Sequence, residues 1–231
     1  MRKIGLIGGL SWVSTAEYYR LLNEITQKTL GGVNSPRLIL ESVNREDYVQ
    51  HVNIRKDEAA ASKLILNAAR SVEAGGAEFI VICCNDVHRF VPEIQPRINI
   101  PFLHIAEATG RAIKKAGLSR VALLGVMKTM EGTFYQDVLS SFGIETMVPD
   151  ADTRDYVDKT IMDEMVRGRF SPQTRDRYID LMWRLNKKGA EGIILGCTEI
   201  PLLIMQKDID LPTFSTTDLH CQAAVEMALA D

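Results

Sequence analysis

The sequence lacks the long apolar runs and the excess of basic residues that mark two large classes of protein. No hydrophobic stretch approaches the roughly 18 to 20 residues that span a bilayer, so we expect no membrane partner. Lys and Arg number 27 against 30 Asp and Glu, which gives no basic surface for nucleic acid. Near the N-terminus, Gly8 and Gly9 interrupt an apolar segment that is too short for a signal-peptide core. We therefore expect a cytoplasmic protein.

Cysteine is scarce, and several common motifs are missing. The 4 cysteines include no C-x-x-C, which disfavours a zinc or thioredoxin-type site. The 4 histidines show no H-E-x-x-H spacing, so we expect no metal centre. Neither G-x-G-x-x-G nor a P-loop is present, which leaves little support for a bound nucleotide.

What the sequence does contain is a regular alternation of apolar strands and amphipathic helices. The segments typical of strands are residues 3–7, 36–43, 78–83, 101–104, 120–125, 145–148, 192–195 and 212–214. The segments typical of helices are residues 15–30, 56–74, 106–116, 129–142, 152–168, 172–188 and 217–229. His51 is expected in a polar loop. The alternation predicts an α/β fold with parallel sheets.

The order of the elements repeats along the chain. Each half begins with a strand that ends at glycine and contains a later strand that runs into cysteine. We therefore expect two similar, doubly wound, Rossmann-like lobes. The first comprises residues 1–99, with residues 209–231 packing back on it, and the second comprises residues 100–208. Because ligands of such sheets bind at the carboxyl ends of the strands, we expect an active-site cleft between the lobes.

Two of the cysteines are candidate catalytic groups. A lone cysteine on an apolar strand is usually a small core residue, and Cys83 and Cys221 are expected to be so. Cys84 and Cys197 each end a strand and precede a predicted helix start, where a thiolate is favoured. Two opposed thiols suit the movement of a proton from one face of a carbon to the other. His88 lies one helical turn beyond Cys84, where it either tunes the thiol or packs.

Small polar residues accompany both cysteines and both glycine turns. Asn85 and Thr198 follow the two cysteines and offer matching hydrogen bonds. Ser11 lies on the first glycine turn and is a candidate donor to a substrate carboxylate. Thr129 lies on the equivalent second turn and is either such a donor or a helix cap.

These motifs together resemble a known family. Cys84-Asn85 and the tetrapeptide from Gly196 to Glu199 are similar to the aspartate/glutamate racemase superfamily, specifically its aspartate racemase branch. Glu199 stands where glutamate racemases usually carry histidine, which favours the aspartate branch. Further similarity lies in residues 4–12, 101–106, 123–125 and 129–130.

The resemblance implies a cofactor-independent amino-acid racemase that acts on a small amino acid or dicarboxylate. It implies that Cys84 and Cys197 are the two bases of a 1,1-proton transfer at the α-carbon. By the same resemblance Asn85 and Thr198 hold the substrate. Glu199, Ser11 and Thr129 are further candidates for the binding site, and members are often homodimers.

One departure from the family pattern concerns the substrate. Asn-Thr usually follows the first cysteine, whereas this chain has Asn85-Asp86. If Asp86 faces the site it repels a dicarboxylate, by about 4 kcal/mol at ~4 Å and an effective dielectric of about 20, and a neutral or basic substrate is favoured. The alternative is that Asp86 is a helix cap turned away from the cleft. A shift of strand register would bring Cys83 to the site, but the family match favours Cys84.

Two other function classes stay open at this point. Diacid cis-trans isomerases of the same fold also use two cysteines, whereas the related decarboxylases typically keep one. A protein that binds a small acid on a catalytically altered racemase scaffold is the non-enzymatic reading, and Asp86 is the feature that supports it.

Overall fold

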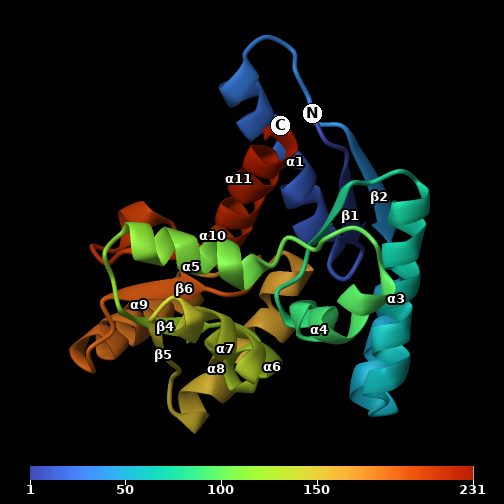
Figure 1. The fold of residues 1–231 in the computed structure, drawn as a ribbon. Helices are drawn as coiled ribbons and strands as arrows, with labels where there is room; N and C mark the ends of the chain where they lie inside the picture. The colour runs from blue at the N-terminus through green and yellow to red at the C-terminus, as the bar shows by residue number, and fades with distance from the viewer. Residues whose placement is uncertain (231) are drawn as a thin grey trace. The chain divides into compact units, whose positions relative to one another are not determined.

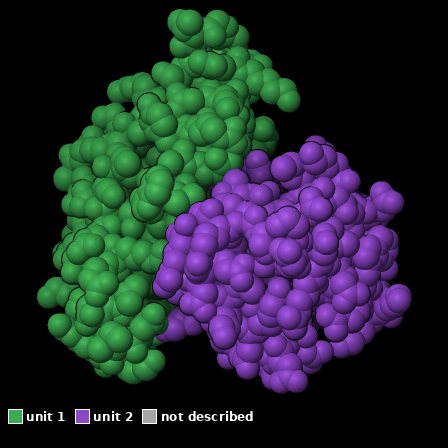
Figure 2. Space-filling model, turned by 180° about the vertical axis from the view of Figure 1, so that it is seen from behind, with its two compact units in different colours: residues 1–104, 220–231 green, residues 105–219 purple. Residues whose placement is uncertain are grey.

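The computed structural model describes residues 1–230 (Figure 1). The chain divides into two compact units, which Figure 2 shows in different colours. Unit 1 comprises residues 1–104 and the C-terminal segment from His220, and unit 2 comprises residues 105–219. No helix within residues 1–230 is long and apolar enough to cross a membrane.

Unit 1 is an α/β unit with a short parallel sheet. Its strands are β1 (Ile4–Gly8), β2 (Leu38–Ser42) and β3 (Phe79–Ile82). Its α-helices are α1 (Trp12–Leu30), α2 (Arg45–Val49), α3 (Glu58–Ala74) and α4 (Val91–Ile94), together with most of α11 (Thr216–Leu229). The π-helix η1 (Gln50–Ile54) and the 3-10 helices η2 (Asp86–Phe90) and η3 (Gln95–Arg97) complete it.

The sheet of unit 1 has the order β2-β1-β3 and is covered on both faces. Side chains of β3 alternate between the faces, as the pleat requires. Ile80 and Ile82 pack with α3 on one face. Val81 and Cys83 pack on the other face with α1 and α11, which lie side by side in Figure 1. This burial on both faces explains why the strand is almost wholly apolar.

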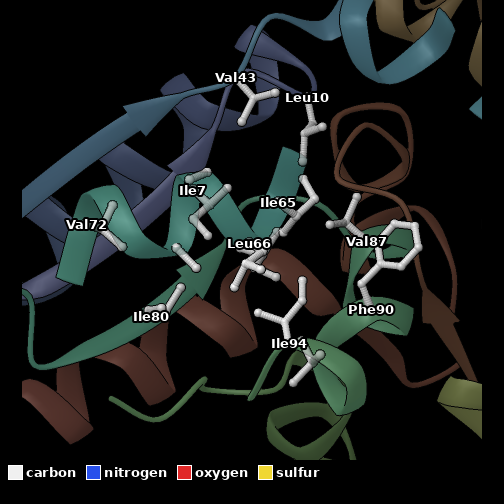
Figure 3. Close-up of a cluster of buried hydrophobic side chains, with 14 of the residues drawn as sticks. Ile7, Leu10, Val43, Ile65, Leu66, Val72, Ile80, Val87, Phe90 and Ile94 are labelled. Carbon is white, nitrogen blue, oxygen red and sulfur yellow. The ribbon is translucent and has the colours of Figure 1, made fainter. Parts of the chain in front are cut away.

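The cluster against α3 also holds the segment that follows β3. Figure 3 shows Ile65 and Leu66 of α3 in one cluster with Val87, Phe90 and the strand residues. Val87 and Phe90 belong to η2, so the core anchors the turn that carries Cys84, Asn85 and Asp86.

Unit 2 is built on the same plan. Its strands are β4 (Arg120–Leu124), β5 (Glu145–Met147), β6 (Gly192–Leu195) and β7 (Thr213–Ser215). Its α-helices are α5 (Ile105–Lys115), α6 (Met127–Glu131), α7 (Thr133–Ser141), α8 (Ala151–Asp163), α9 (Pro172–Lys187) and α10 (Ile200–Leu203). The 3-10 helices are η4 (Met165–Arg167) and η5 (Gln206–Asp208).

The sheet of unit 2 is parallel and has the order β5-β4-β6-β7. Ala122 and Leu124 of β4 pack with α8 and α9, whereas Val121 and Leu123 pack with α5 and α7. In both units the first strand in sequence is central and the strand that precedes the cysteine lies next to it. The predicted α/β fold, with two similar parallel sheets, is confirmed.

Two sequence predictions about individual elements are wrong. Residues 101–104 do not form a strand, because only Phe102 makes an isolated bridge, to Ile80, before α5 begins. Residues 129–142 are not one helix. Gly132 separates α6 from α7 with extended backbone, and a Cβ there would lie 2.5 Å from the Lys128 carbonyl oxygen.

Two further predictions also need correction. His51 is not in a loop, because it lies in η1 directly after α2, which Asn44 caps by accepting from the Glu46 amide. Residues 152–168 are not one continuous helix. The α-helix α8 ends at Asp163, and the shorter η4 ends at Gly168, whose φ of 73° favours glycine.

Candidate active site

The first candidate thiol follows β3 in unit 1. Cys83 is 1% exposed in the core against α1 and α11, and burial, with the neighbouring Cys84 charge, raises the pKa of its thiol. Cys84 is partly exposed and lies just before η2. Since a thiolate is the reactive form, the accessible Cys84 is the better candidate and Cys83 behaves as a core residue.

Asp86 is buried and lies in an ion-pair network rather than at a helix cap. Its Oδ2 accepts a hydrogen bond from the Tyr48 hydroxyl at 2.7 Å and lies 2.5 Å from Arg89 Nη1. Arg89 also contacts Glu58 at 2.8 Å. The cap of η2 is Asn85 with no side-chain cap bond, so the helix-cap alternative for Asp86 is wrong. Because Arg89 compensates the carboxylate, Asp86 brings less repulsion to the turn than its sequence position suggested.

Tyr48 and Arg89 are residues that the sequence reasoning missed. Burial, followed by the charge of Asp86, raises the pKa of Tyr48 and keeps its hydroxyl a donor. The spacing of Asp86 and Arg89 was a usable signal, because residues three apart on a helical turn are neighbours. Tyr48 gave no signal, because nothing in the sequence pattern places it beside Asp86.

The second candidate thiol follows β6 in unit 2. Cys197 is partly exposed, whereas Thr198 and Glu199 are buried. The Cys197 thiol donates to Glu199 Oε2 at 3.1 Å, and the Thr198 hydroxyl donates to the same oxygen at 2.7 Å. Glu199 was expected at the substrate, and its carboxylate contacts the thiol and the hydroxyl.

Thr129 lies beside this second thiol turn. It is the third residue of α6, whose cap is Val126 without a side-chain bond, so the helix-cap alternative for Thr129 is wrong. A Cβ on Gly125 would lie 3.1 Å from Thr129 Cγ2 and 2.8 Å from the Gly196 carbonyl oxygen. Glycine at 125 therefore lets α6 and the Cys197 turn approach closely.

The hydroxyl of Thr129 has a distinctive environment. Thr129 is 0% exposed, and within the described residues Oγ1 has no hydrogen-bond partner. A buried hydroxyl without a partner is costly and usually has a functional reason. The hydroxyl of Thr129 therefore has a hydrogen that no described residue accepts.

Ser11 lies on the equivalent turn of unit 1. Its side chain accepts from the Ser14 amide at 3.4 Å, so it caps α1. Its carbonyl accepts from the Thr15 hydroxyl, and Thr15 Oγ1 accepts from the Gly9 amide at 2.9 Å. Gly9, with φ at 81°, turns the chain into α1. Ser11 therefore shapes the turn at the carboxyl end of β1.

The structure brings the predicted residues together in two groups. In unit 1 the Ser11 turn and the turn of Cys84, Asn85 and Asp86 follow the paired strands β1 and β3. In unit 2 the turns of Thr129 and of Cys197, Thr198 and Glu199 follow the paired strands β4 and β6. Within residues 1–230 no group of His, Cys, Asp and Glu side chains is arranged to hold a metal ion.

Comparisons with known proteins agree with this arrangement. A candidate Asp/Glu racemase from Yersinia pestis, known from a crystal structure, is 41% identical, with a TM-score of 0.92 and full coverage of both chains. An aspartate racemase homologue from Pyrococcus horikoshii is 31% identical, with a TM-score of 0.87 and full coverage of both chains.

Sequence comparison gives the same family. The broad specificity amino-acid racemase RacX of Bacillus subtilis is 24% identical over 98% of each chain. The model of the Asp/Glu/hydantoin racemase family matches residues 7–224, which confirms the resemblance seen in the motifs. The chain therefore belongs to the Asp/Glu/hydantoin racemase family, and it is an isomerase of the amino-acid racemase class.

Proposed function

We propose that this racemase inverts the α-carbon of a small amino acid by a cofactor-independent proton transfer between two thiols, Cys84 and Cys197. The observation that carries the proposal is the matched setting of the two thiols. Each is partly exposed and follows a strand that pairs with the central strand of its sheet. Each precedes a buried polar residue, Asn85 or Thr198.

The proposed reaction balances without an oxidant or a reductant. One thiolate takes the proton from the α-carbon and becomes a thiol. The other thiol gives its proton to the opposite face and becomes a thiolate. One turnover exchanges the protonation states of the two cysteines, so the enzyme is then ready for the reverse direction.

The contact between Cys197 and Glu199 supports an assignment of the starting protonation states. A carboxylate can only accept a hydrogen bond, so the 3.1 Å contact needs the proton on the sulfur of Cys197. Cys197 is then the proton donor, and Cys84 is the thiolate base of the same direction of reaction. In this proposal Glu199 acts on the reaction through the thiol proton that it accepts.

The proposed substrate site uses hydrogen bonds to stabilise the carbanion. Negative charge from the α-carbon spreads onto the substrate carboxylate, where hydrogen-bond donors stabilise it. Thr129 supplies a hydroxyl, and Asn85 supplies a side-chain amide in the Cys84 turn. The Thr198 hydroxyl donates to Glu199 and lies in the Cys197 turn, where the family resemblance places it at the substrate.

The substrate class follows from the charges near Cys84. Arg89 balances Asp86, so we include dicarboxylic amino acids with neutral and basic ones. A homodimeric assembly and a cytoplasmic location belong to the proposal through the family resemblance. Light scattering during gel filtration tests the assembly.

A panel of single enantiomers tests the function. The protein is incubated, without pyridoxal phosphate, with the L and D forms of aspartate, glutamate, alanine, lysine and arginine, and the products are separated by chiral chromatography. We expect at least one pair to interconvert, and a C84S/C197S double variant to be inactive. If no enantiomer is converted while a cis diacid is isomerised, the protein is a diacid isomerase. Retained activity in the double variant would exclude the thiols.

A further inference from the structure

A buried histidine contacts the backbone of the Cys84 turn, and the proton transfer does not use it. His88 lies in η2 and is 0% exposed. Its Nδ1 lies 2.8 Å from the Cys84 carbonyl oxygen and 3.3 Å from the Asn85 carbonyl oxygen. One imidazole nitrogen thus contacts the backbone of two residues that the proposed mechanism places at the substrate, Cys84 and Asn85.

These contacts decide the tautomer of His88. A carbonyl oxygen only accepts, so Nδ1 must carry the hydrogen. The other nitrogen, Nε2, is buried and has no hydrogen-bond partner among the described residues. A proton on Nε2 would be a buried donor without an acceptor, which is costly. The geometry therefore requires a neutral ring protonated at Nδ1.

The groups around His88 also favour a neutral ring. The ring centroids of His104 and His220 lie 4.9 and 5.4 Å from that of His88. Burial, and then the charges that these two rings would carry, hold the pKa of His88 well below its ordinary value. On η2 itself the charged neighbours are Asp86 and Arg89, which pair with each other.

Both ring nitrogens of His220, which lies beside His88, also have hydrogen-bond partners. Its Nε2 lies 2.8 Å from the Leu103 carbonyl oxygen and must carry a hydrogen there. Its Nδ1 then accepts from the Tyr18 hydroxyl at 2.9 Å. His88 and His220 therefore adopt opposite tautomers, and residues of α1, α11 and η2 meet under the Cys84 turn.

We propose that His88 is a positioning residue, whose Nδ1–H holds the carbonyls of Cys84 and Asn85 so that the thiol and the amide keep their orientation toward the substrate. The role in catalysis rests on the proposed two-thiol racemase. A positioning error of about 1 Å can cost about a hundredfold in rate, so one hydrogen bond to this turn is a significant constraint. The contact of His88 with the turn does not depend on which amino acid is the substrate.

Nitrogen-15 NMR of the histidine-labelled protein tests the contact without any turnover. We expect the His88 ring to show protonated Nδ1 and unprotonated Nε2, unchanged between pH 5 and 8. The H88Q variant identifies the signal by its loss. An Nε2–H tautomer, or a ring that titrates in this range, would overturn the proposal even if the protein is a racemase.

A pair of amide variants tests the effect on catalysis. In H88N the side-chain amide nitrogen takes the place of Nδ1, whereas in H88Q it takes the place of Nε2. The two variants are matched because each buries one side-chain amide. We expect H88N to keep most of kcat, and H88Q to lower kcat about tenfold or more with little change in KM. Amide hydrogen exchange of residues 83–90 should speed up in H88Q alone. Equal kcat and equal exchange in the two variants would contradict the role. If the wild-type protein converts no amino acid, the racemase proposal is wrong. The nitrogen-15 NMR and the amide hydrogen exchange still test the contact of His88 with the Cys84 turn.

Discussion

The Cys197 sulfur lies 3.1 Å from Glu199 Oε2, and the carboxylate accepts the thiol proton. Glu199 is 2% exposed, so solvent screens its charge only weakly. A buried negative charge beside the sulfur disfavours the thiolate and keeps the proton on Cys197.

Replacement of Glu199 by Gln should therefore increase the reactivity of Cys197. The neutral amide removes the like-charge penalty, and we expect iodoacetamide to alkylate Cys197 about tenfold faster at neutral pH, which corresponds to roughly 1.4 kcal/mol. Peptide mass spectrometry measures the rate, and Cys84 in the same molecule is the control. An unchanged or slower rate at Cys197 would show that Glu199 does not hold the thiol proton.

Replacement of Thr129 by Val should separate the contribution of the hydroxyl to substrate binding from its contribution to folding stability. Valine has the same shape, and Thr129 Oγ1 has no hydrogen-bond partner within residues 1–230. T129V should leave the unfolding free energy unchanged or raise it by about 1 kcal/mol, because a costly buried hydroxyl is removed. If the hydroxyl binds the substrate carboxylate, kcat/KM should fall about tenfold or more, since a bond to a charged group contributes about 1.5 to 3 kcal/mol.

T129S is the matched control for the lost hydroxyl. It keeps the donor and should retain more activity than T129V, although it loses a buried methyl group. Urea denaturation and initial rates measure the two effects. Full activity in T129V would remove Thr129 from the substrate site.

The ion pair of Asp86 with Arg89 leads to a prediction about substrate choice. In D86T the partly buried Arg89 loses one of its two carboxylate partners and keeps Glu58 and the Tyr48 hydroxyl, so the unfolding free energy should fall by about 2 kcal/mol. Because Arg89 already balances Asp86, aspartate turnover should not rise. Urea denaturation and initial rates with aspartate check both statements. A gain in aspartate turnover would restore the repulsion hypothesis.

The repeated pattern of strand, glycine and cysteine was sufficient to predict two similar parallel sheets. It succeeded because hydrophobic periodicity and glycine turns are local in sequence. It did not reveal Tyr48 at Asp86, because that contact joins segments that only the fold brings together. The break at Gly132 was missed because a glycine inside a periodic helix is often tolerated. The contact of Glu199 with the Cys197 thiol was not foreseen, because spacing alone does not give side-chain direction.

The buried His104 makes stability depend on pH. Burial lowers the pKa of His104 to about 4, whereas an unfolded histidine titrates near about 6.5. Between these values the unfolded chain binds the proton and the folded chain does not. The contribution of the neutral His104 to the unfolding free energy should therefore be fully present above pH 6.5. The unfolding free energy should fall by about 3 kcal/mol as the pH drops to about 4.

The H104N variant isolates this contribution. Urea midpoints measured from pH 7 to pH 4 should show a smaller loss of stability in H104N than in the wild type. The buried His88 contributes in the same direction and is present in both proteins. Parallel curves for the two proteins would show that His104 does not titrate in this way.

The most direct test of the two-thiol account is exchange of the α-proton in D2O, followed by proton NMR on each enantiomer of a converted amino acid. C84S and C197S are measured separately beside the wild type. We expect the wild type to incorporate deuterium into both enantiomers as they interconvert, and each variant to lose racemisation by about a hundredfold or more. Racemisation at the wild-type rate in either single variant would contradict the account.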